Sequence, residues 1–242
     1  VNLAASLAAT HRRVLLVDMD PQGNATMGCG IDKMNLELST CDVLLGDASA
    51  ADTIVSAPEG NFAVMPGNDD LTVAEVELLQ RIGREMQLGK ALAPVSGLYD
   101  FILIDCPPSI NMLTVNALTA ADGVLIPMQC EYYALEGLSA LLSTIEQIRD
   151  TVNPRLELYG ILRTMFDPRI NLSNEVSMQL IDHFDRKVFR TVVPRNVRLA
   201  EAPSFGRPAL LHDRSSRGAI AYLALAGEIL RREDAVAAAG AA

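Results

Sequence analysis

The sequence has few of the residues from which metal centres and disulfide frameworks are built. It holds three histidines, which lie far apart and match no metal-ligand spacing. Its four cysteines show neither a C-x-x-C pair nor a regular spacing, which argues against structural zinc and a disulfide scaffold. The positions concerned are His11, His183, His212, Cys29, Cys41, Cys106 and Cys130. We expect these side chains to lie at the surface or to pack inside a protein of the reducing cytoplasm.

Long apolar runs and an excess of positive charge are also missing. The longest apolar candidate runs from Ala117 to Met128 and is interrupted by Asp122, so it is too short to span a membrane. The first residues lack the charged region and the cleavage site of a signal peptide. The net charge of −10 and the pI of about 4.8 exclude a general coat for nucleic acid, and any DNA binding needs a local basic face.

The hydrophobic pattern that is present predicts an α/β fold. The chain has 242 residues, half of them hydrophobic, and its apolar runs lack the strict alternation of strands that face water. We predict a single domain over 1–242, with a doubly wound, mostly parallel sheet and helices on both faces. The predicted strands are 14–18, 62–67, 99–105, 123–128, 158–166 and 189–194, and the predicted helices are 1–9, 71–98, 111–121, 134–152 and 173–185. The alanine-rich end, 235–242, is expected to be a disordered tail.

Two of the predicted strands end on acidic residues. Asp18 and Asp20 follow the run Val14 to Val17, and Asp105 closes the run that begins at Tyr99. Ligands gather outside the carboxyl ends of the strands of an open parallel sheet, and carboxylates there commonly hold Mg²⁺ through water or orient an attacking water. The alternative is that these acids only cap the turns that follow.

Four segments in order resemble the ParA/Soj chromosome and plasmid partition ATPases, of the deviant-Walker P-loop class that includes MinD. These segments are VLLVDMDPQGNAT, YDFILIDCPPS, PMQCEYYALEGL and VVPRNVRLAEAPSFGRP. The resemblance covers essentially the whole chain. It implies binding of ATP and Mg²⁺, a homodimer in the ATP-bound form, nonspecific binding to nucleoid DNA, and a ParB-type partner that stimulates hydrolysis. It also implies a cytoplasmic, nucleoid-associated protein with no membrane partner.

The resemblance also implies roles for single residues. Asp20 would orient the attacking water, Asp18 would support Mg²⁺ and the first switch, and Asp105 would be the Walker B acid. The other implied positions are Pro21 and Gln22 in the first switch, Pro107, Pro108 and Ser109 in the second switch, and Pro194 and Asn196 beside the adenine and ribose. Each has a plainer interpretation as a strand-end cap, a strand breaker or a turn former.

One element of the family pattern is missing. The sequence contains no K-G-G-x-G-K-[ST]-[ST] loop, whose backbone N–H groups and lysines bind the phosphates. The first residues resemble the helix that follows this loop, so we expect a chain truncated at its N-terminus, before that helix. Such a chain would lack an interior strand, leave strand edges unpaired, and bind ATP weakly or not at all.

Arginines gather in the last third of this acidic chain. They are Arg163, Arg169, Arg195, Arg198, Arg207, Arg214 and Arg217. By the resemblance Arg169 and Arg198 contact DNA, whereas the alternative is that several arginines pair with Asp167, Glu201 and Asp213. Two other functions are alternatives. The first is a MinD-like membrane-associated ATPase, which needs a basic amphipathic C-terminal helix, whereas 223–242 has only two arginines. The second is a non-catalytic fragment or interaction module.

Overall fold

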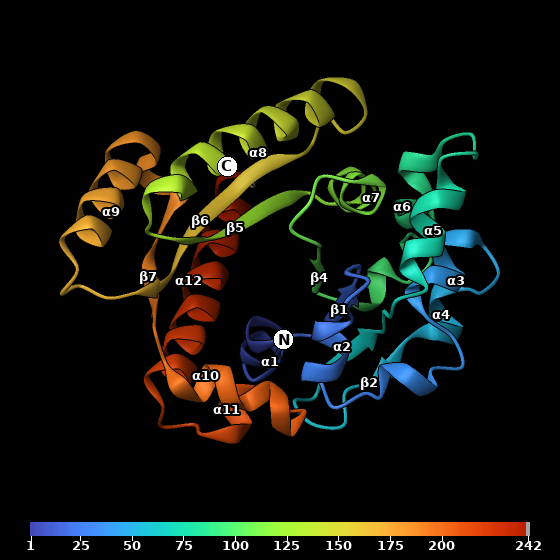
Figure 1. Cartoon of the computed structure of the whole chain (residues 1–242), viewed down its shortest axis with the longest axis horizontal. Coiled ribbons are helices and arrows are strands. Elements are labelled where there is room, and N and C mark those ends of the chain that lie inside the picture. Colours follow the sequence, from blue (N-terminus) through green and yellow to red (C-terminus); the bar gives the residue numbers. More distant parts are fainter. Residues whose placement is uncertain (241–242) are drawn as a thin grey trace.

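A computed structural model describes residues 1–240 of the chain, and its first sheet contains the amino-terminal strands. The sheet order is β2-β3-β1-β4, and β1 pairs in parallel with both β3 and β4, whereas β2 is antiparallel to β3. The strands are β1 (Val14–Asp18), β2 (Val55–Ser56), β3 (Ala63–Met65) and β4 (Phe101–Asp105). Strand β1 is therefore central, with its carboxyl end beside that of β4 (Figure 1).

The second sheet contains β5 (Gly123–Gln129), β6 (Glu157–Phe166) and β7 (Val188–Pro194), all parallel. No described strand joins β4 to β5, so the strands form two sheets, in line with the expectation that an interior strand is missing and that strand edges stay unpaired. The α/β class with mostly parallel strands is confirmed, and the facing edges of β4 and β5 are unpaired among residues 1–240.

The helices of the first half lie on both faces of the first sheet. They are α1 (Asn2–Ala8), α2 (Asn24–Gly28), α3 (Thr40–Leu45), α4 (Ala50–Thr53), α5 (Leu71–Leu78), α6 (Gln87–Leu92) and α7 (Met112–Ala120). Helix α1 lies on one face and α3 to α7 lie on the other. The prediction of a single helix over 71–98 is wrong, because this segment forms separate helices. It is divided because Gly83 adopts a left-handed conformation with φ of 63°, and the 3₁₀ turn Arg84–Met86 follows before α6 begins.

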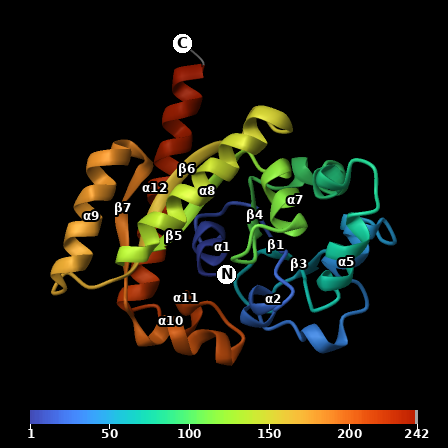
Figure 2. The ribbon, with the colours of Figure 1, turned by 45° about the horizontal axis from the view of Figure 1, so that its top comes forward.

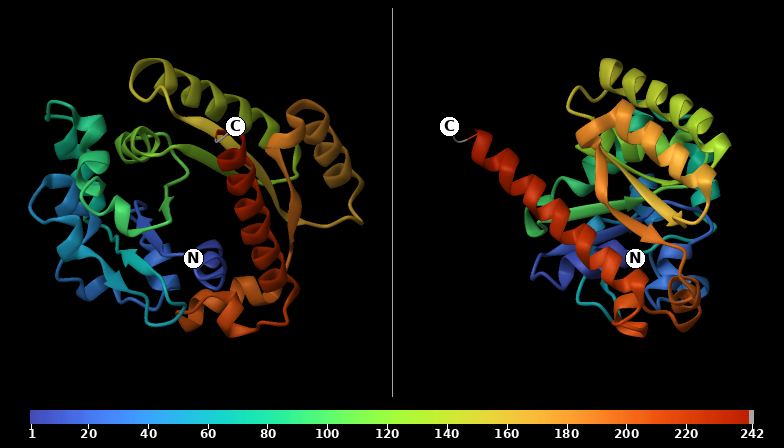
Figure 3. Two further views of the ribbon diagram at one scale, coloured as in Figure 1. Left: turned by 180° about the vertical axis from the view of Figure 1, so that it is seen from behind. Right: turned by 90° about the vertical axis from the view of Figure 1, so that its left-hand side faces the viewer.

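The second half supplies five more helices. They are α8 (Tyr132–Thr151), α9 (Asn171–Phe184), α10 (Val197–Glu201), α11 (Ala209–His212) and α12 (Arg217–Gly240), with further 3₁₀ turns at Lys33–Asn35, Ser96–Leu98, Asp185–Lys187 and Ala202–Phe205. Of these helices, α8 and α9 lie close to the predicted helices 134–152 and 173–185, whereas α10, α11 and α12 were not predicted. Helix α12 runs past the second sheet and projects from the body of the molecule (Figures 2 and 3). Part of the expected tail, 235–240, is helical here, and 241–242 lie outside the described residues.

The core explains why β1 is apolar at every position before Asp18. Leu15 and Val17 face a cluster with α3, α5, α6 and α7, whereas Val14 and Leu16 face a cluster with α1 and α12. All four side chains are at most 2% exposed. A strand buried on both faces needs no polar alternation, which is how the sequence pattern identified it.

Helix α12 also completes the edge of β7. The buried carboxylate of Glu228 accepts hydrogen bonds from the backbone N–H groups of Arg190 and Thr191, each at 2.8 Å. Arg232 donates to Glu228 at 3.1 Å and lies 3.9 Å above the Phe189 ring. These contacts tie α12 to the second sheet. Within residues 1–240, no helix combines the length and the apolarity that crossing a membrane requires.

Candidate active site

The two acidic strand ends lie side by side, as the sequence predicted. Asp18 closes β1 and Asp105 closes β4, and the parallel register pairs their Cα atoms directly. The backbone N–H of Met19 donates to the carbonyl oxygen of Asp105 at 2.9 Å, which holds the two strand ends together. The register thus puts two carboxylates at one edge of the sheet, where a polar ligand can reach them.

Asp18 is fully buried and held by Thr26 of α2. Its Oδ2 atom accepts the Thr26 backbone N–H at 2.8 Å and the Thr26 hydroxyl at 2.7 Å, and its Oδ1 atom accepts the backbone N–H of Asp20 at 3.2 Å. Burial raises the pKa of Asp18 to about 6, although the hydrogen bonds from Thr26 act in the opposite direction. Three donors in fixed positions orient this carboxylate toward α2.

Asp105 and Asp20 are the more accessible acids of the site. The pKa of Asp105 is raised, mainly because the surrounding protein partly desolvates its carboxyl group and to a smaller extent because Asp20 is close by. Asp20 is half-buried, and its Oδ1 atom accepts the backbone N–H of Gln22 at 2.9 Å. No hydrogen bond to the Asp105 carboxylate occurs within the described part of the chain, so this group is free to accept one from a ligand.

The turn after β1 holds the expected first switch in a constrained conformation. Gly23 has a φ of 60°, and a Cβ atom on it would lie 2.7 Å from the carbonyl oxygen of Gly67. The turn closes through the Gly23 N–H and the carbonyl oxygen of Asp20, at 2.9 Å, and Lys33 donates to the carbonyl oxygen of Gln22. Only glycine satisfies both the conformation and the close approach at this position.

The expected second switch leaves β4 toward α7. Pro107 is buried, whereas Pro108 and Ser109 are exposed. The carbonyl oxygen of Ser109 accepts the Thr114 hydroxyl at 2.7 Å, and Asn111 caps α7 through the Thr114 N–H at 3.0 Å. The segment therefore joins Asp105 to a capped helix.

Pro194 and Asn196 lie at the carboxyl end of β7, in the second sheet. Asn196 is the N-cap of α10, where its side chain accepts the backbone N–H of Leu199 at 3.3 Å. Within residues 1–240, no hydrogen bond joins either residue to the aspartates of β1 and β4. The observed contact of Asn196 is therefore that of a helix cap. Binding of the nucleotide by Pro194 and Asn196 stays a prediction.

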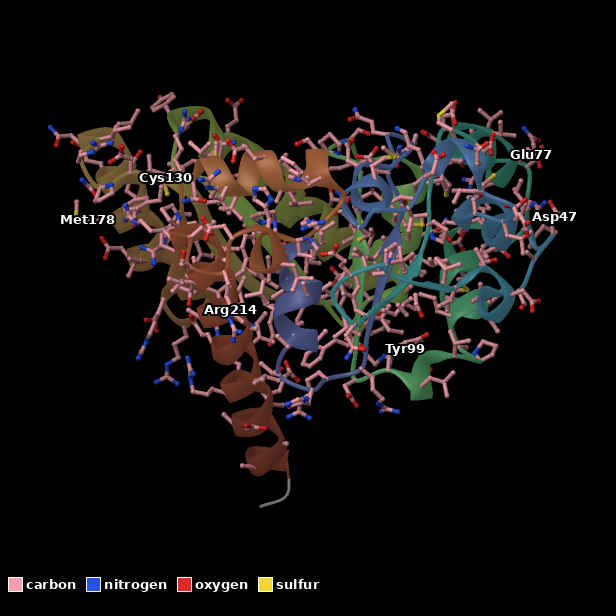
Figure 4. The ribbon with its side chains drawn as sticks, turned by 90° about the horizontal axis from the view of Figure 1, so that it is seen from below. Asp47, Glu77, Tyr99, Cys130, Met178 and Arg214 are labelled. Atoms are coloured by element: carbon pink, nitrogen blue, oxygen red, sulfur yellow. The ribbon has the colours of Figure 1, made fainter. Side chains whose placement is uncertain are left out.

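The arginines of the last third divide into three groups. Arg163 is buried, donating to Ser177 and to the Phe189 carbonyl, so it is unavailable to DNA. Arg169 and Arg198 are exposed and paired with acids, as the alternative interpretation expected, and Arg207 pairs with Glu59 at 3.1 Å. The exposed residues without an ion pair to a described residue are Arg195, Arg214 and Arg217. Figure 4 shows Arg214 far from the acidic Asp47 and Glu77, which lie together at the opposite end of the molecule.

Thr26 is the functional residue that the sequence reasoning missed. It binds Asp18 through two donors, and its hydroxyl oxygen accepts the backbone N–H of Gly67 at 2.9 Å. One side chain therefore connects β1, α2 and the end of β3. Thr26 is the last residue of the segment VLLVDMDPQGNAT, which carries the family resemblance. Its hydrogen bonds to Asp18 could not be predicted from the sequence, because they depend on how α2 folds back over the end of β1.

The donor set at this edge fits a hydrated divalent cation better than a directly ligated metal. Within the described residues, no group of three or more His, Cys, Asp or Glu side chains is arranged to hold a metal ion. Asp18 is already committed to Thr26, whereas Asp105 has open acceptor capacity. Such a site suits Mg²⁺, which keeps several of its waters and binds through one or two carboxylates.

Comparisons with known proteins show which family and fold the chain is similar to. Residues 1–158 match the family model described as AAA domain. The chain is 52% identical to the sporulation initiation inhibitor protein Soj of Bacillus subtilis, over 95% of this chain and 90% of that protein. It is 50% identical to the chromosome partitioning protein ParA of Myxococcus xanthus, over 96% of this chain and 82% of that protein.

A solved structure is similar over almost the same range. It is described as cobyrinic acid a,c-diamide synthase from Mycobacterium smegmatis with bound ADP and magnesium. The TM-score is 0.83 at 39% sequence identity, covering 96% of this chain and 87% of that one. That protein therefore holds ADP and magnesium on a fold similar to the one described for this chain.

Proposed function

Because the chain belongs to the ParA/Soj family of chromosome-partition ATPases, we propose that it works as a ParA-type ATPase in the partitioning of a chromosome or plasmid. The observation that carries the proposal is the direct pairing of Asp18 with Asp105 at the carboxyl ends of β1 and β4, with Asp20 beside them. This is where an open parallel sheet binds its ligands.

In this proposal the three acids divide the work. Asp105 holds a hydrated Mg²⁺ through its free oxygens, and Asp18, fixed by Thr26, keeps α2 and the first switch in place. Asp20 accepts a hydrogen bond from the attacking water and orients it in line with the terminal phosphate. Bound Mg²⁺ supplies the positive charge that offsets the charge developing on the phosphate oxygens. Pro194 and Asn196 contact the adenine and ribose.

The proposal extends to the two loops that follow the acidic strand ends. Pro21 and Gln22 form the first switch, and Pro107, Pro108 and Ser109 form the second. Both loops begin at an acid of the site, so a change in what the acids bind is passed to the turn after β1 and to the start of α7. The ATP-bound form is a homodimer, and a ParB-type protein stimulates its hydrolysis.

The DNA part of the proposal concerns the basic segments of the second half. Arg169 and Arg198 bind phosphates of nonspecific DNA, which makes the protein nucleoid-associated in the cytoplasm. Support comes from their exposure, with side chains 87% and 51% accessible, and from the exposed Arg195, which acts on the Asp167 carboxylate and has no ion pair with a residue in 1–240. A local cluster of arginine can bind phosphates although the whole chain is acidic.

The test of the proposed function is ATP hydrolysis. Since the 242 residues contain no phosphate-binding loop, two proteins are compared. One is this chain, and the other is the chain extended before Val1 by a strand and a K-G-G-x-G-K-[ST]-[ST] loop of the family pattern. We expect Mg²⁺-dependent hydrolysis by the extended protein only, and its loss in Asp20→Ala. Hydrolysis that Asp20→Ala leaves intact, or an extended, folded protein that is inactive, would refute the proposal.

A further inference from the structure

Both arginines proposed to bind DNA are already bound to carboxylates of their own segments. Arg169 makes a two-pronged pair with Asp167: its Nε donates to Oδ1 at 2.9 Å, and its Nη2 donates to Oδ2 at 2.6 Å. The Arg169 guanidinium lowers the pKa of Asp167 to about 2. The fork of the guanidinium is thus occupied in the geometry by which arginine also binds phosphate.

Arg198 is held by two acids from different elements. Its Nη1 donates to Glu201 Oε2 at 2.7 Å, one turn along α10, and its Nε lies 3.3 Å from Asp213 Oδ2 beyond α11. Both acids are partly exposed, so their ion pairs with Arg198 lie at the surface of the protein. Two carboxylates therefore neutralise one guanidinium on the face where it would meet DNA.

The pairing is selective among the exposed arginines of this region. Arg195, Arg214 and Arg217 have no ion pair with a residue in 1–240. Of the two carboxylates bonded to Arg169 and Arg198 most closely, Asp167 lies two residues before its arginine and Glu201 three residues after it. The local sequence thus provides an anion next to each of the two arginines.

We propose that Asp167 and Glu201, with Asp213, are intramolecular competitors of the DNA phosphates: they occupy Arg169 and Arg198 in the free protein and so limit its DNA affinity. The inference rests on the proposed DNA-binding function and adds its regulation. A phosphate oxygen and a carboxylate oxygen cannot occupy the same N–H fork together, so each arginine exchanges one anion for the other on binding. Because the acids lower the DNA affinity, the complex of the protein with DNA should also dissociate at a lower salt concentration.

The expected size of the effect follows from the exposure of the pairs. Exposed ion pairs of this kind are weak, so removing one competitor should raise DNA affinity by roughly two- to fivefold at low salt. The gain should shrink as salt rises, because screening weakens the ion pair and the phosphate contact alike.

The experiment measures binding of the 242-residue chain to a fluorescent duplex of arbitrary sequence by anisotropy, from about 25 to 200 mM salt. The variants are Asp167→Asn and Glu201→Gln, alone and together. The matched control is Glu175→Gln in α9, which removes the same charge six residues after Arg169 from an exposed residue with no ion pair in the described structure. We expect each single variant and the double variant to bind the duplex more tightly than the wild type does. The DNA affinity of the control should change little.

A second comparison separates competition from simple repulsion of DNA by a nearby acid. In an Arg169→Ala background, Asp167→Asn should give no more gain than Glu175→Gln does, because the arginine that it frees is gone. The inference is overturned if Asp167→Asn still raises DNA affinity in this background, or if Asp167→Asn and Glu201→Gln bind DNA no more tightly than the control. In either case, binding of DNA by the wild type still supports the proposed DNA function. If no variant binds DNA, or if binding survives Arg198→Glu, the DNA function fails as well.

Discussion

Replacing Asp18 with asparagine should stabilise the protein, and more at pH 7.5 than at pH 4.5. The folded chain buries this carboxyl group completely and raises its pKa from the ordinary 3.8 to about 6. Between these values the folded state keeps a proton that the unfolded state has lost. The free energy of unfolding therefore falls as the pH rises from about 4 to about 6, and the loss is complete above that range.

The magnitude follows from the size of the shift. One pKa unit corresponds to about 1.4 kcal/mol, so a shift of roughly two units destabilises the ionised protein by about 3 kcal/mol at pH 7.5. At pH 4.5 the same linkage gives about 1 kcal/mol. Asparagine does not ionise, so the difference in stability between Asp18→Asn and the wild type should be about 2 kcal/mol more favourable at the higher pH. Any hydrogen bond that asparagine makes less well is lost equally at both pH values.

Urea unfolding followed by far-ultraviolet circular dichroism measures this difference, since the chain has no tryptophan for a fluorescence signal. Other groups that titrate in this range are common to both proteins and cancel in the comparison. The control is Asp69→Asn, an exposed residue whose side chain has no hydrogen bond in the described structure, and it should change stability little at either pH. An Asp18→Asn effect that is equal at the two pH values, or more favourable at pH 4.5, would show that burial does not set the Asp18 charge state.

Two other substitutions test the packing around the site and the second sheet. Glu228→Ala should lower the free energy of unfolding by about 1–3 kcal/mol in urea titrations, because the N–H groups of Arg190 and Thr191 lose their acceptor. Burial acts to raise the pKa of Glu228, but these hydrogen bonds outweigh it and hold the pKa below the ordinary 4.5. The loss should therefore diminish as the pH falls below 4.5, and a pH-independent loss would contradict this reasoning. Gly23→Ala should cost at least about 1 kcal/mol by the same measurement, because its φ of 60° and the approach to Gly67 leave no room for a Cβ atom; a neutral result would mean that the turn adapts.

The sequence determined the parts of this protein that depend on local pattern. The continuous apolar run of β1 indicated burial on both faces, and acids at the ends of two parallel strands had to reach the same edge of the sheet. Their position at one edge followed from these two facts, whereas the direct pairing of Asp18 with Asp105 also required β1 and β4 to be neighbouring strands. The carboxylate partners of Arg169 and Arg198 were also foreseeable, because Asp167 and Glu201 lie within three residues of them.

Only the tertiary structure decided the features that join distant segments. The place where the sheet is interrupted, between β4 and β5, depends on which strand edges meet, and the division of the helix expected over 71–98 depends on the conformation of Gly83. Thr26 holds Asp18 because α2 folds back over the end of β1, and Glu228 binds amides 37 and 38 residues away. Hydrogen bonds to buried carboxylates follow from packing, and packing sets whether an acid at the end of a strand is a solvated cap or a buried group with a pKa near 6.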